Sequence, residues 1–292
     1  MNSDSSKKLS YGSFGDLYIG EELNNKKKVA IKVEAITDKN QQLINEYRIY
    51  QVIGCLEKKI GFPQIFHFCQ WNQYNVLVME LLGRNLEDVF ESCKRNFSLK
   101  TILYITLQLI DRFEFIHFKK ICYRDVKPEN FLLGFSNGEQ KNTIFVVDFG
   151  LSKGYIDHTG RHVPYREGLN LIGTARYMSI NSHLGVEQSR RDDLEALAHV
   201  ILYFVRKGQL PWSGLKGGTI RDRYRQIGLI KQETSIDNLC AGHPQEFADF
   251  LKYTRRLAFE EDPNYQLIRV WFNNLFVKNK FREDDKYEWN LR

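Results

Sequence analysis

The change in hydrophobic pattern near residue 83 constrains the fold more than any other feature of the sequence. Before it, short runs rich in β-branched and aromatic residues occupy 16–20, 29–33 and 74–82, and a polar turn fills 24–27. Runs of this length and composition predict strands. One stretch, roughly 40–54, instead carries Leu43, Tyr47 and Tyr50 at helical spacing. The first part of the chain therefore predicts a small antiparallel sheet with one helix.

After residue 83, helical periods dominate, and strand-like pieces near 131–133 and 144–147 are short. The pattern predicts an α+β protein in which a small β-rich part, residues 1–82, precedes a larger, mainly helical part, residues 83–292. We interpret 1–292 as a single domain, because no repeat or low-complexity linker divides it. The expected helices are 86–93, 99–119, 191–207, 220–230, 244–259 and 263–276.

Composition and targeting signals exclude several classes of protein. Hydrophobic residues at 42% and charged residues at 27% exclude a disordered chain. The longest apolar run, 197–205, is far shorter than the ~20 residues that span a bilayer, and residues 1–10 lack the apolar stretch of a signal peptide. The 5 cysteines form no CxxC pair, and an odd number favours reduced thiols. We expect a cytoplasmic or nuclear protein without a membrane span.

Positive charge is concentrated in one stretch. The chain has 42 Lys and Arg against 36 Asp and Glu, a net charge of +6. Between Arg161 and Arg225 there are 11 basic and 6 acidic residues, an excess of +5. Such a stretch would attract acidic peptides at a rate that falls with salt. We assign no nucleic-acid role to the basic residues and no zinc site to the 7 scattered histidines.

The motifs between residues 123 and 150 carry the strongest chemical signal. The run Tyr-Arg-Asp-Val-Lys-Pro-Glu-Asn fills 123–130, and Asp-Phe-Gly follows at 148–150. Phosphoryl transfer needs a carboxylate for the hydroxyl proton, a cation for the moving phosphoryl group and oxygen ligands for Mg²⁺. Asp125 and Lys127 supply the first two, and Asn130 with Asp148 supplies the third. A charged turn is the alternative, which the combination of the two motifs disfavours.

A glycine-containing loop lies near the N-terminus. Ser-Tyr-Gly-Ser-Phe-Gly at 10–15 matches the GxGxxG pattern only in its last two glycines. In a dinucleotide-binding fold the loop would open a helix, but here it precedes predicted strands, so it lies on a hairpin. A flexible flap over phosphates is the functional interpretation, and a plain hairpin turn is the alternative.

Two further charged residues indicate a function only when they are considered as a pair. Lys32 ends the predicted strand 29–33, and Glu46 lies on the helix that follows. Each alone is typical of a solvated surface. As an ion pair they could hold a cation against the α- and β-phosphates of a nucleotide.

With these motifs, the sequence resembles a eukaryotic protein kinase and, more narrowly, the casein kinase I family. The resemblance spans about residues 8–290 and implies the bilobal protein kinase fold, with a small β-rich lobe and a larger helical lobe. It also implies that MgATP binds between the lobes. The matching segments are GSFGD at 12–16, MELLG at 79–83, RDVKP at 124–128, GTARY at 173–177, SIN at 179–181, EQSRRDDLE at 187–195 and LPW at 210–212.

The resemblance implies roles for individual residues. Asp125 would orient the substrate hydroxyl, Lys127 would steady the γ-phosphoryl group, and Asn130 with Asp148 would hold Mg²⁺. Asp193 would anchor the backbone of the catalytic loop. Lys32 and Glu46 would complete the catalytic set. The ATP site would comprise Leu9, Ser10, Gly12, Ser13, Phe14, Gly15, Leu17, Ala30, Lys32, Met79, Glu80, Leu82, Leu132 and Val147.

Kinases of this family prefer Ser or Thr with acidic or phosphorylated residues on the amino-terminal side. Arg176, Gly214 and Arg223 match the family's anion pocket, whereas Leu169 and Ile220 replace residues that are often Lys in relatives. We therefore expect a weaker pocket. A solvated helix face is the alternative interpretation of Arg223.

Three departures from the kinase pattern leave every reacting group in place. Ser10 replaces the first glycine of the loop, which would raise the nucleotide KM, and Tyr123 stands where the family usually has His. Ser-Ile-Asn at 179–181 replaces the superfamily's Ala-Pro-Glu and is itself a trait of the narrower family.

The sequence thus favours a monomeric Ser/Thr protein kinase that uses ATP and Mg²⁺ on protein substrates. A pseudokinase or scaffold is the alternative, disfavoured because a binding module needs none of the six catalytic residues together. Lys127, two residues beyond Asp125, argues against a tyrosine kinase. The chain ends soon after residue 290, so we expect no regulatory tail. Either a minimal kinase or a truncated chain would account for this.

Overall fold

The computed structural model describes residues 7–12, 15–38, 41–135 and 140–290. The chain forms two compact units. Unit 1 comprises Met1–Asn85 and Phe131–Ser152, and unit 2 comprises Leu86–Asn130 and Lys153–Arg292. The sequence boundary near residue 83 agrees with the first crossing between units. It does not show that residues 131–152 return to unit 1.

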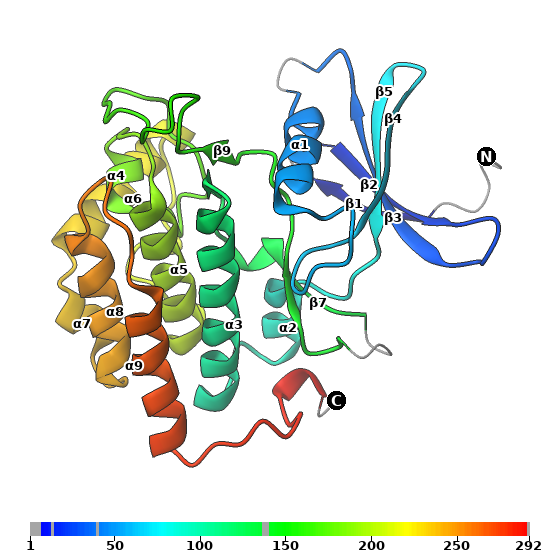
Figure 1. Ribbon diagram of the computed structural model, residues 1–292. Helices are drawn as coiled ribbons and strands as arrows, with labels where there is room; N and C mark the ends of the chain where they lie inside the picture. The colour runs from blue at the N-terminus through cyan, green and yellow to red at the C-terminus, as the bar shows by residue number, and fades with distance from the viewer. Residues whose placement is uncertain (1–6, 13–14, 39–40, 136–139, 291–292) are drawn as a thin grey trace. The chain divides into compact units, whose positions relative to one another are not determined.

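Unit 1 contains a five-stranded antiparallel sheet with strand order β1-β2-β3-β5-β4 (Figure 1). Its strands are β1 (Lys7–Gly12), β2 (Gly15–Glu21), β3 (Lys28–Ala35), β4 (Ile65–Trp71) and β5 (Tyr74–Glu80). β2, β3 and β5 confirm the predicted sheet. β1 and β4 were not predicted. In β1 the run KKLSYG has neither a β-branched residue nor clear alternation, so its pattern is weak.

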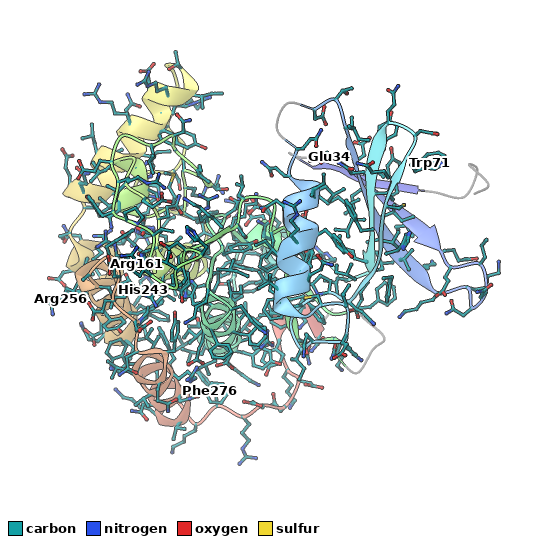
Figure 2. All side chains as sticks on the ribbon, turned by 45° about the horizontal axis from the view of Figure 1, so that its top comes forward. Glu34, Trp71, Arg161, His243, Arg256 and Phe276 are labelled. Carbon is teal, nitrogen blue, oxygen red and sulfur yellow. The ribbon has the colours of Figure 1, made fainter. Side chains whose placement is uncertain are left out.

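Helix α1 (Leu43–Ile53) confirms the single predicted helix of this part and is three residues shorter at its start. Its buried face includes Leu43, Ile49 and Ile53, while Val52 is 51% exposed. The carboxylate of Glu34, on β3, accepts from the backbone N–H groups of Gln42 at 2.6 Å and Leu43 at 3.2 Å. A buried side chain of the sheet therefore satisfies donors that the first turn of a helix leaves unpaired. Figure 2 labels Glu34 within unit 1.

A second hairpin, β7 (Phe131–Leu133) with β8 (Ile144–Val146), joins unit 1. A β-bridge links Leu132 to Asn85, and the N–H of Gly83 donates to the carbonyl of Leu133 at 2.8 Å. The buried ring of Phe149 then packs edge-on against Tyr50 of α1, with ring centroids 5.1 Å apart. These contacts bring the segment after β8 to α1.

Unit 2 is mainly helical, as expected. The six predicted helices are present as α2 (Leu86–Ser92), α3 (Leu99–Phe118), α5 (Arg190–Val205), α6 (Ile220–Glu233), α8 (Gln245–Arg256) and α9 (Tyr265–Lys278). The short helices α4 (Ile180–His183) and α7 (Ile236–Cys240) were not predicted, because one turn carries no periodic signal. The remaining elements are the strand pair β6 (Ile121–Cys122) and β9 (Lys153–Gly154) and the 3₁₀ turns η1 (Pro128–Asn130) and η2 (Glu288–Asn290).

Helix α5 lies between α3 and α8 (Figure 1) and is buried along almost its whole length. Its first turns nevertheless carry buried polar groups, among them Asp192, Asp193 and Glu195. Such groups are expensive to bury unless they are paired. Asp192 bonds to the Ser179 hydroxyl and the Ser189 N–H, Asp193 bonds to the loop after β6, and Glu195 pairs with Arg255 of α8. Within the described ranges, no helix is long and apolar enough to cross a membrane.

Candidate active site

Unit 1 brings together three charged side chains from three segments. The ammonium group of Lys32 on β3 contacts the Glu46 carboxylate on α1 at 2.6 Å and the Asp148 carboxylate at 3.1 Å. The predicted ion pair between Lys32 and Glu46 is therefore present, and Asp148 joins it. Glu46 is 1% exposed, so the pair is shielded from water.

Burial alone would lower the pKa of Lys32, because it disfavours the charged amine. The negative charges of Asp148 and Glu46, together with their hydrogen bonds, outweigh this effect and raise the pKa of Lys32 above its ordinary value. The ammonium form is thus fixed at neutral pH. A permanent cation at this position suits the phosphates of a nucleotide.

Helix α1 also holds the segment that follows Asp148. The side-chain amide of Asn45 donates to the carbonyls of Gly150 at 3.2 Å and Ser152 at 3.1 Å, and the backbone N–H of Asp148 donates to the Tyr50 hydroxyl at 3.3 Å. Asp148 has a positive φ of 60°, which an Asp tolerates better than most residues. One helix therefore positions both the carboxylate partner of Lys32 and the Asp-Phe-Gly motif.

The described adenine-site residues predicted by the resemblance all belong to unit 1. Ala30 pairs with Met79 across β3 and β5, and both are buried. The N–H of Glu80 donates to the Gln64 carbonyl at 2.8 Å. Leu17, Leu82, Leu132 and Val147 are half-buried or buried.

The glycine loop is described only in part. Gly12 and Gly15 pair at the hairpin between β1 and β2, which confirms that the loop lies on a hairpin, and Ser10 pairs with Leu17. Leu9 also lies on β1. The predicted Ser13 and Phe14 fall outside the described residues.

In unit 2, Asp193 of α5 holds the catalytic loop. Its carboxylate accepts from the backbone N–H groups of Tyr123 at 2.7 Å and Arg124 at 2.8 Å, and from His117 Nε2 at 2.9 Å. This confirms the anchoring role expected of Asp193. Arg124 has a φ of 70°, a conformation that costs a non-glycine residue about 1 kcal/mol. The two charge-assisted hydrogen bonds from the N–H groups of Tyr123 and Arg124 to the Asp193 carboxylate offset that cost.

Asp125 lies at the centre of a small hydrogen-bond network. Its Oδ2 contacts Lys127 Nζ at 2.6 Å and Asn130 Nδ2 at 3.2 Å, while its Oδ1 accepts from the Thr174 hydroxyl at 2.9 Å. Asp125 is 4% exposed. The carboxylate is therefore fixed on both oxygens, as positioning a hydroxyl nucleophile requires.

The donor groups fit a magnesium ion chemically. Mg²⁺ takes oxygen ligands. The amide nitrogen of Asn130 is engaged with the carbonyl and carboxylate of Asp125, at 3.0 and 3.2 Å, so the amide oxygen is its remaining polar atom. Asp148 meets Lys32 through Oδ1, and its side chain is 25% exposed. Asn130 and Asp148 thus each present an oxygen of the right kind.

Unit 2 contains a buried carboxylate just before α5, which contacts β9 and the loop that follows β9. Glu187, which is 3% exposed, contacts Lys153 and Arg166, each at 2.8 Å. Burial would raise the pKa of Glu187, but these two cations lower it below its ordinary value. Arg166 is thus paired within the protein, but the net charge of +5 between 161 and 225 already subtracts Glu187 and is unchanged by this pair.

Two of the three residues predicted to bind an anion share a hollow of about 390 Å³. Arg176 and Gly214 line it, together with Tyr203 and Arg95. Arg223 lies exposed on α6 and is not among the lining residues. Two arginines thus line the hollow. The sequence did not suggest Arg95, whose guanidinium group also donates to Glu91.

The family model of the protein kinase domain matches residues 4–262. The chain belongs to the protein kinase domain family, and its antiparallel sheet and helical C-terminal part confirm the predicted bilobal α+β fold. The protein is therefore a phosphotransferase of the ATP-binding protein kinases, which act on proteins.

Sequence reasoning missed several residues that shape the site. Glu34 holds α1, Thr174 bonds to Asp125, and Arg95 lines the hollow. Thr174 lies inside a motif that was identified, so its signal was present. Glu34 and Arg95 have no local motif, and only folding brings them to their partners.

Proposed function

We propose that this protein kinase is a Ser/Thr kinase of the casein kinase I type. In this proposal, it transfers the γ-phosphate of MgATP to Ser or Thr hydroxyls of acidic or already phosphorylated proteins. The observation that carries the proposal is the environment of Asp125, whose two oxygens bind Lys127 and Thr174. A Lys two residues beyond the catalytic Asp is the arrangement by which a Ser/Thr kinase steadies the phosphoryl group.

The proposal assigns distinct work to each unit. In unit 1, the Glu80 carbonyl and Leu82 backbone would recognise the adenine edge, and Lys32 would hold the α- and β-phosphates. In unit 2, Asp125 would orient the acceptor hydroxyl and take its proton as Lys127 stabilises the charge on the transferred group. When bound, Mg²⁺ supplies charge neutralisation at the phosphates, with Asn130 and Asp148 as its protein ligands.

The preference for acidic substrates draws support from the hollow at Arg176. Guanidinium groups bind phosphate with two parallel hydrogen bonds, and the backbone at Gly214 can add a third donor. Arg176 also lies over the rings of Tyr177 and Tyr203, 5.7 and 5.6 Å from the ring centroids, which restrain it. Arg223 does not line this hollow, and its part in binding the anion stays a proposal that the double variant below tests.

The proposed location is the cytoplasm, the nucleus or both, with the protein acting as a monomer. All five cysteines are unpaired, which fits a reducing compartment.

One assay tests the activity. Purified protein is incubated with labelled ATP and casein, beside Lys32→Ala and Asp148→Asn. We expect labelling by the wild-type protein on Ser and Thr only, and none above background by the variants. Labelling that persists in both variants would reveal a contaminating kinase, and a wild-type protein that binds nucleotide without labelling would favour the scaffold alternative.

A second assay tests the anion pocket with matched primed and unprimed peptides. The double variant Arg176→Ala with Arg223→Ala should lower kcat/KM for the primed peptide by about tenfold or more per lost charge-assisted bond. The unprimed peptide should change little. Equal losses on the two peptides would remove these residues from a phosphate site.

A further inference from the structure

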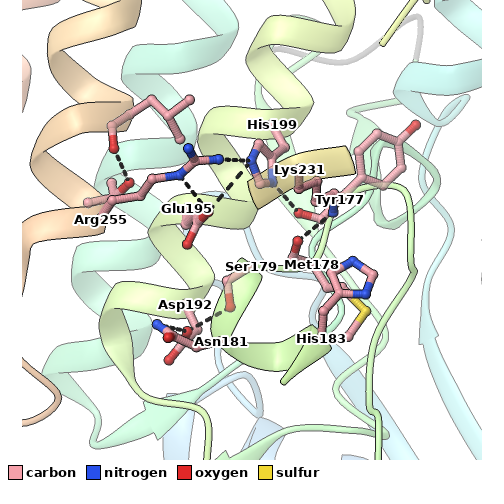
Figure 3. A network of polar contacts seen from close by, with 12 residues as sticks. Tyr177, Met178, Ser179, Asn181, His183, Asp192, Glu195, His199, Lys231 and Arg255 are labelled. Carbon is pink, nitrogen blue, oxygen red and sulfur yellow. Dashed lines mark hydrogen bonds and ion pairs between the residues drawn. The ribbon is translucent and has the colours of Figure 1, made fainter. Parts of the chain in front are cut away.

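The segment from Ala175 to Met178 has an unusual hydrogen-bond pattern. Four consecutive backbone carbonyls each accept from a buried side chain. Figure 3 shows the bonds from His199 to Tyr177 and from Lys231 to Met178. Lys231 Nζ donates to the carbonyls of Ala175 at 2.9 Å and Met178 at 2.6 Å, Trp212 Nε1 donates to Arg176 at 2.8 Å, and His199 Nδ1 donates to Tyr177 at 2.8 Å. We call Lys231, His199 and Trp212 the carbonyl clamp.

The three donors of the carbonyl clamp form one packed group. Lys231 and His199 have no exposed surface, and Trp212 is 1% exposed. Lys231 Nζ lies 5.2 Å from the centre of the Trp212 ring, and the rings of His199 and Trp212 meet edge-on at 5.3 Å. They come from α6, α5 and the loop before α6, so three elements converge on one segment.

The charges around the carbonyl clamp keep its donors in place. Glu195 contacts Arg255 at 2.9 Å and His199 Nε2 at 3.7 Å. Burial and the nearby Lys231 lower the pKa of His199 well below its ordinary value, so the ring stays neutral and donates through Nδ1. Burial likewise lowers the pKa of Lys231. In either protonation state the amine has at least two N–H groups, enough for both carbonyls.

Close packing of α6 on α4 brings Lys231 within reach of the segment. A Cβ atom added to Gly228 would lie 2.9 Å from Cβ of His183. No larger side chain fits there without displacing one helix. The glycine therefore lets α6 approach closely one turn before Lys231.

The clamped segment carries two groups that face a substrate in the proposed function. Thr174, immediately before it, bonds to Asp125, and Arg176 within it lines the hollow. One residue before Thr174, a Cβ on Gly173, whose φ is 107°, would lie 2.7 Å from the Arg124 carbonyl. The backbone here touches the catalytic loop so closely that a shift of the segment would move Asp125 or its hydroxyl partner.

We propose that Lys231, acting with His199 and Trp212, is a positioning residue that sets the peptide-binding segment 174–178 against Asp125. The proposal rests on the proposed Ser/Thr kinase function. An apolar side chain would fill this buried site at lower desolvation cost than an amine. The amine is useful there because it captures two carbonyls that flank Arg176 and thereby fixes the path of the backbone.

Two variants separate positioning from simple stabilisation. Lys231→Met keeps the length and the burial but removes the N–H donors. Leu275→Ala, on α9, is the matched control, because it creates a cavity in unit 2 at a residue outside the site. Both are assayed well below their melting temperatures with the wild-type protein, using a primed peptide and MgATP.

We expect Lys231→Met to lower kcat/KM for the peptide by about tenfold or more, since small misplacements of reacting groups are costly. Its KM for ATP should stay within about twofold. The Leu275→Ala control should change neither by more than about twofold. The proposal would be overturned if Lys231→Met kept the wild-type kcat/KM for the peptide. It would also be overturned if the KM for ATP rose by as large a factor as kcat/KM for the peptide fell. A wild-type protein that labels no peptide overturns the function instead.

Hydrogen exchange tests the carbonyl clamp without activity, including in Trp212→Phe, which removes one donor and keeps an aromatic ring. The N–H groups of Tyr177 and Met178 donate to the Thr174 carbonyl at 2.9 and 3.0 Å, so they report on the segment. Exchange of a peptide covering 172–179 should rise at least about tenfold in Lys231→Met or Trp212→Phe, with α9 unchanged. Unchanged protection in both variants would show that the clamp does not hold this segment.

Discussion

The two units hold their functional residues in different ways. In unit 1, Lys32, Glu46 and Asp148 are separated by up to 116 residues and meet through charged side-chain tips. In unit 2, side chains 22 to 56 residues away bind the backbone carbonyls of 175–178. An ion pair fixes the end of a flexible side chain, whereas a bonded carbonyl fixes the chain itself. Substitutions of the charged residues in unit 1 should therefore act through the charge around Lys32. Substitutions around 175–178 should act through the position of the backbone.

The largest effect should follow the loss of charge in unit 1. Glu46→Gln removes one of the two carboxylates that hold Lys32, so the amine turns toward Asp148 and away from the nucleotide. We expect kcat/KM for ATP to fall about 10²-fold, measured at fixed peptide concentration.

The matched control for Glu46→Gln is Glu21→Gln, which removes a carboxylate from an exposed pair with Lys26. Exposed pairs contribute little, so this variant should stay within about twofold of the wild-type protein. Equal effects of the two variants would contradict the importance of the buried charge arrangement.

A moderate effect should follow the loss of the Glu34 carboxylate. Glu34→Ala leaves the first N–H groups of α1 without their acceptor, which should lower the free energy of unfolding by about 1–2 kcal/mol. Because α1 carries Glu46, the KM for ATP should also rise severalfold. Urea unfolding and ATP kinetics measure the two effects.

Glu34→Gln is the companion variant, because its amide oxygen still accepts a hydrogen bond. It should recover most of the ATP affinity. If Glu34→Ala lost stability with an unchanged KM for ATP, the carboxylate would support the helix without positioning Glu46.

The smallest effect concerns pH in unit 2. Burial, followed by the charge of Lys231, lowers the pKa of His183 to about 3. The unfolded chain therefore binds a proton more readily between about pH 6.5 and pH 3, and folding stability falls as pH drops through that window. From pH 7.5 to 5.5, one such histidine should cost about 1 kcal/mol.

His183→Gln keeps a donor for the Ala175 carbonyl, which His183 Nε2 contacts at 3.2 Å, but cannot titrate. Its melting temperature should fall less than that of the wild-type protein over the same pH change. Identical pH dependence in the two proteins would show that His183 is not held neutral.

The sequence predicted residues in contiguous motifs best. Asp125, Lys127 and Asn130 lie within six positions, so one turn brings them together whatever the rest of the chain does. The Lys32–Glu46 pair was also predicted, since a strand and the next helix are neighbours in the chain. Glu34 was missed because a charged residue on a strand usually faces water, and here its partner is the start of a helix.

The carbonyl clamp could not be predicted for a different reason. Its acceptors are backbone atoms, which every residue has, so 175–178 contains no sign of them. Its donors, Lys231, His199 and Trp212, match no shared motif. The return of residues 131–152 to unit 1 was equally hidden, because it depends on the pairing of Leu132 with Asn85 and on the packing of Phe149.

The carboxylate of Glu187 supplies a permanent negative charge to the part of unit 2 that lies around β9. It contacts both Lys153 and Arg166 and offsets one of their two positive charges with a charge that is encoded in the gene and present as soon as the chain folds. No second enzyme has to add that charge, and no phosphatase can remove it. Glu187 therefore ties Lys153 of β9 and Arg166 of the following loop to the stretch before α5 by a charge that the sequence itself supplies.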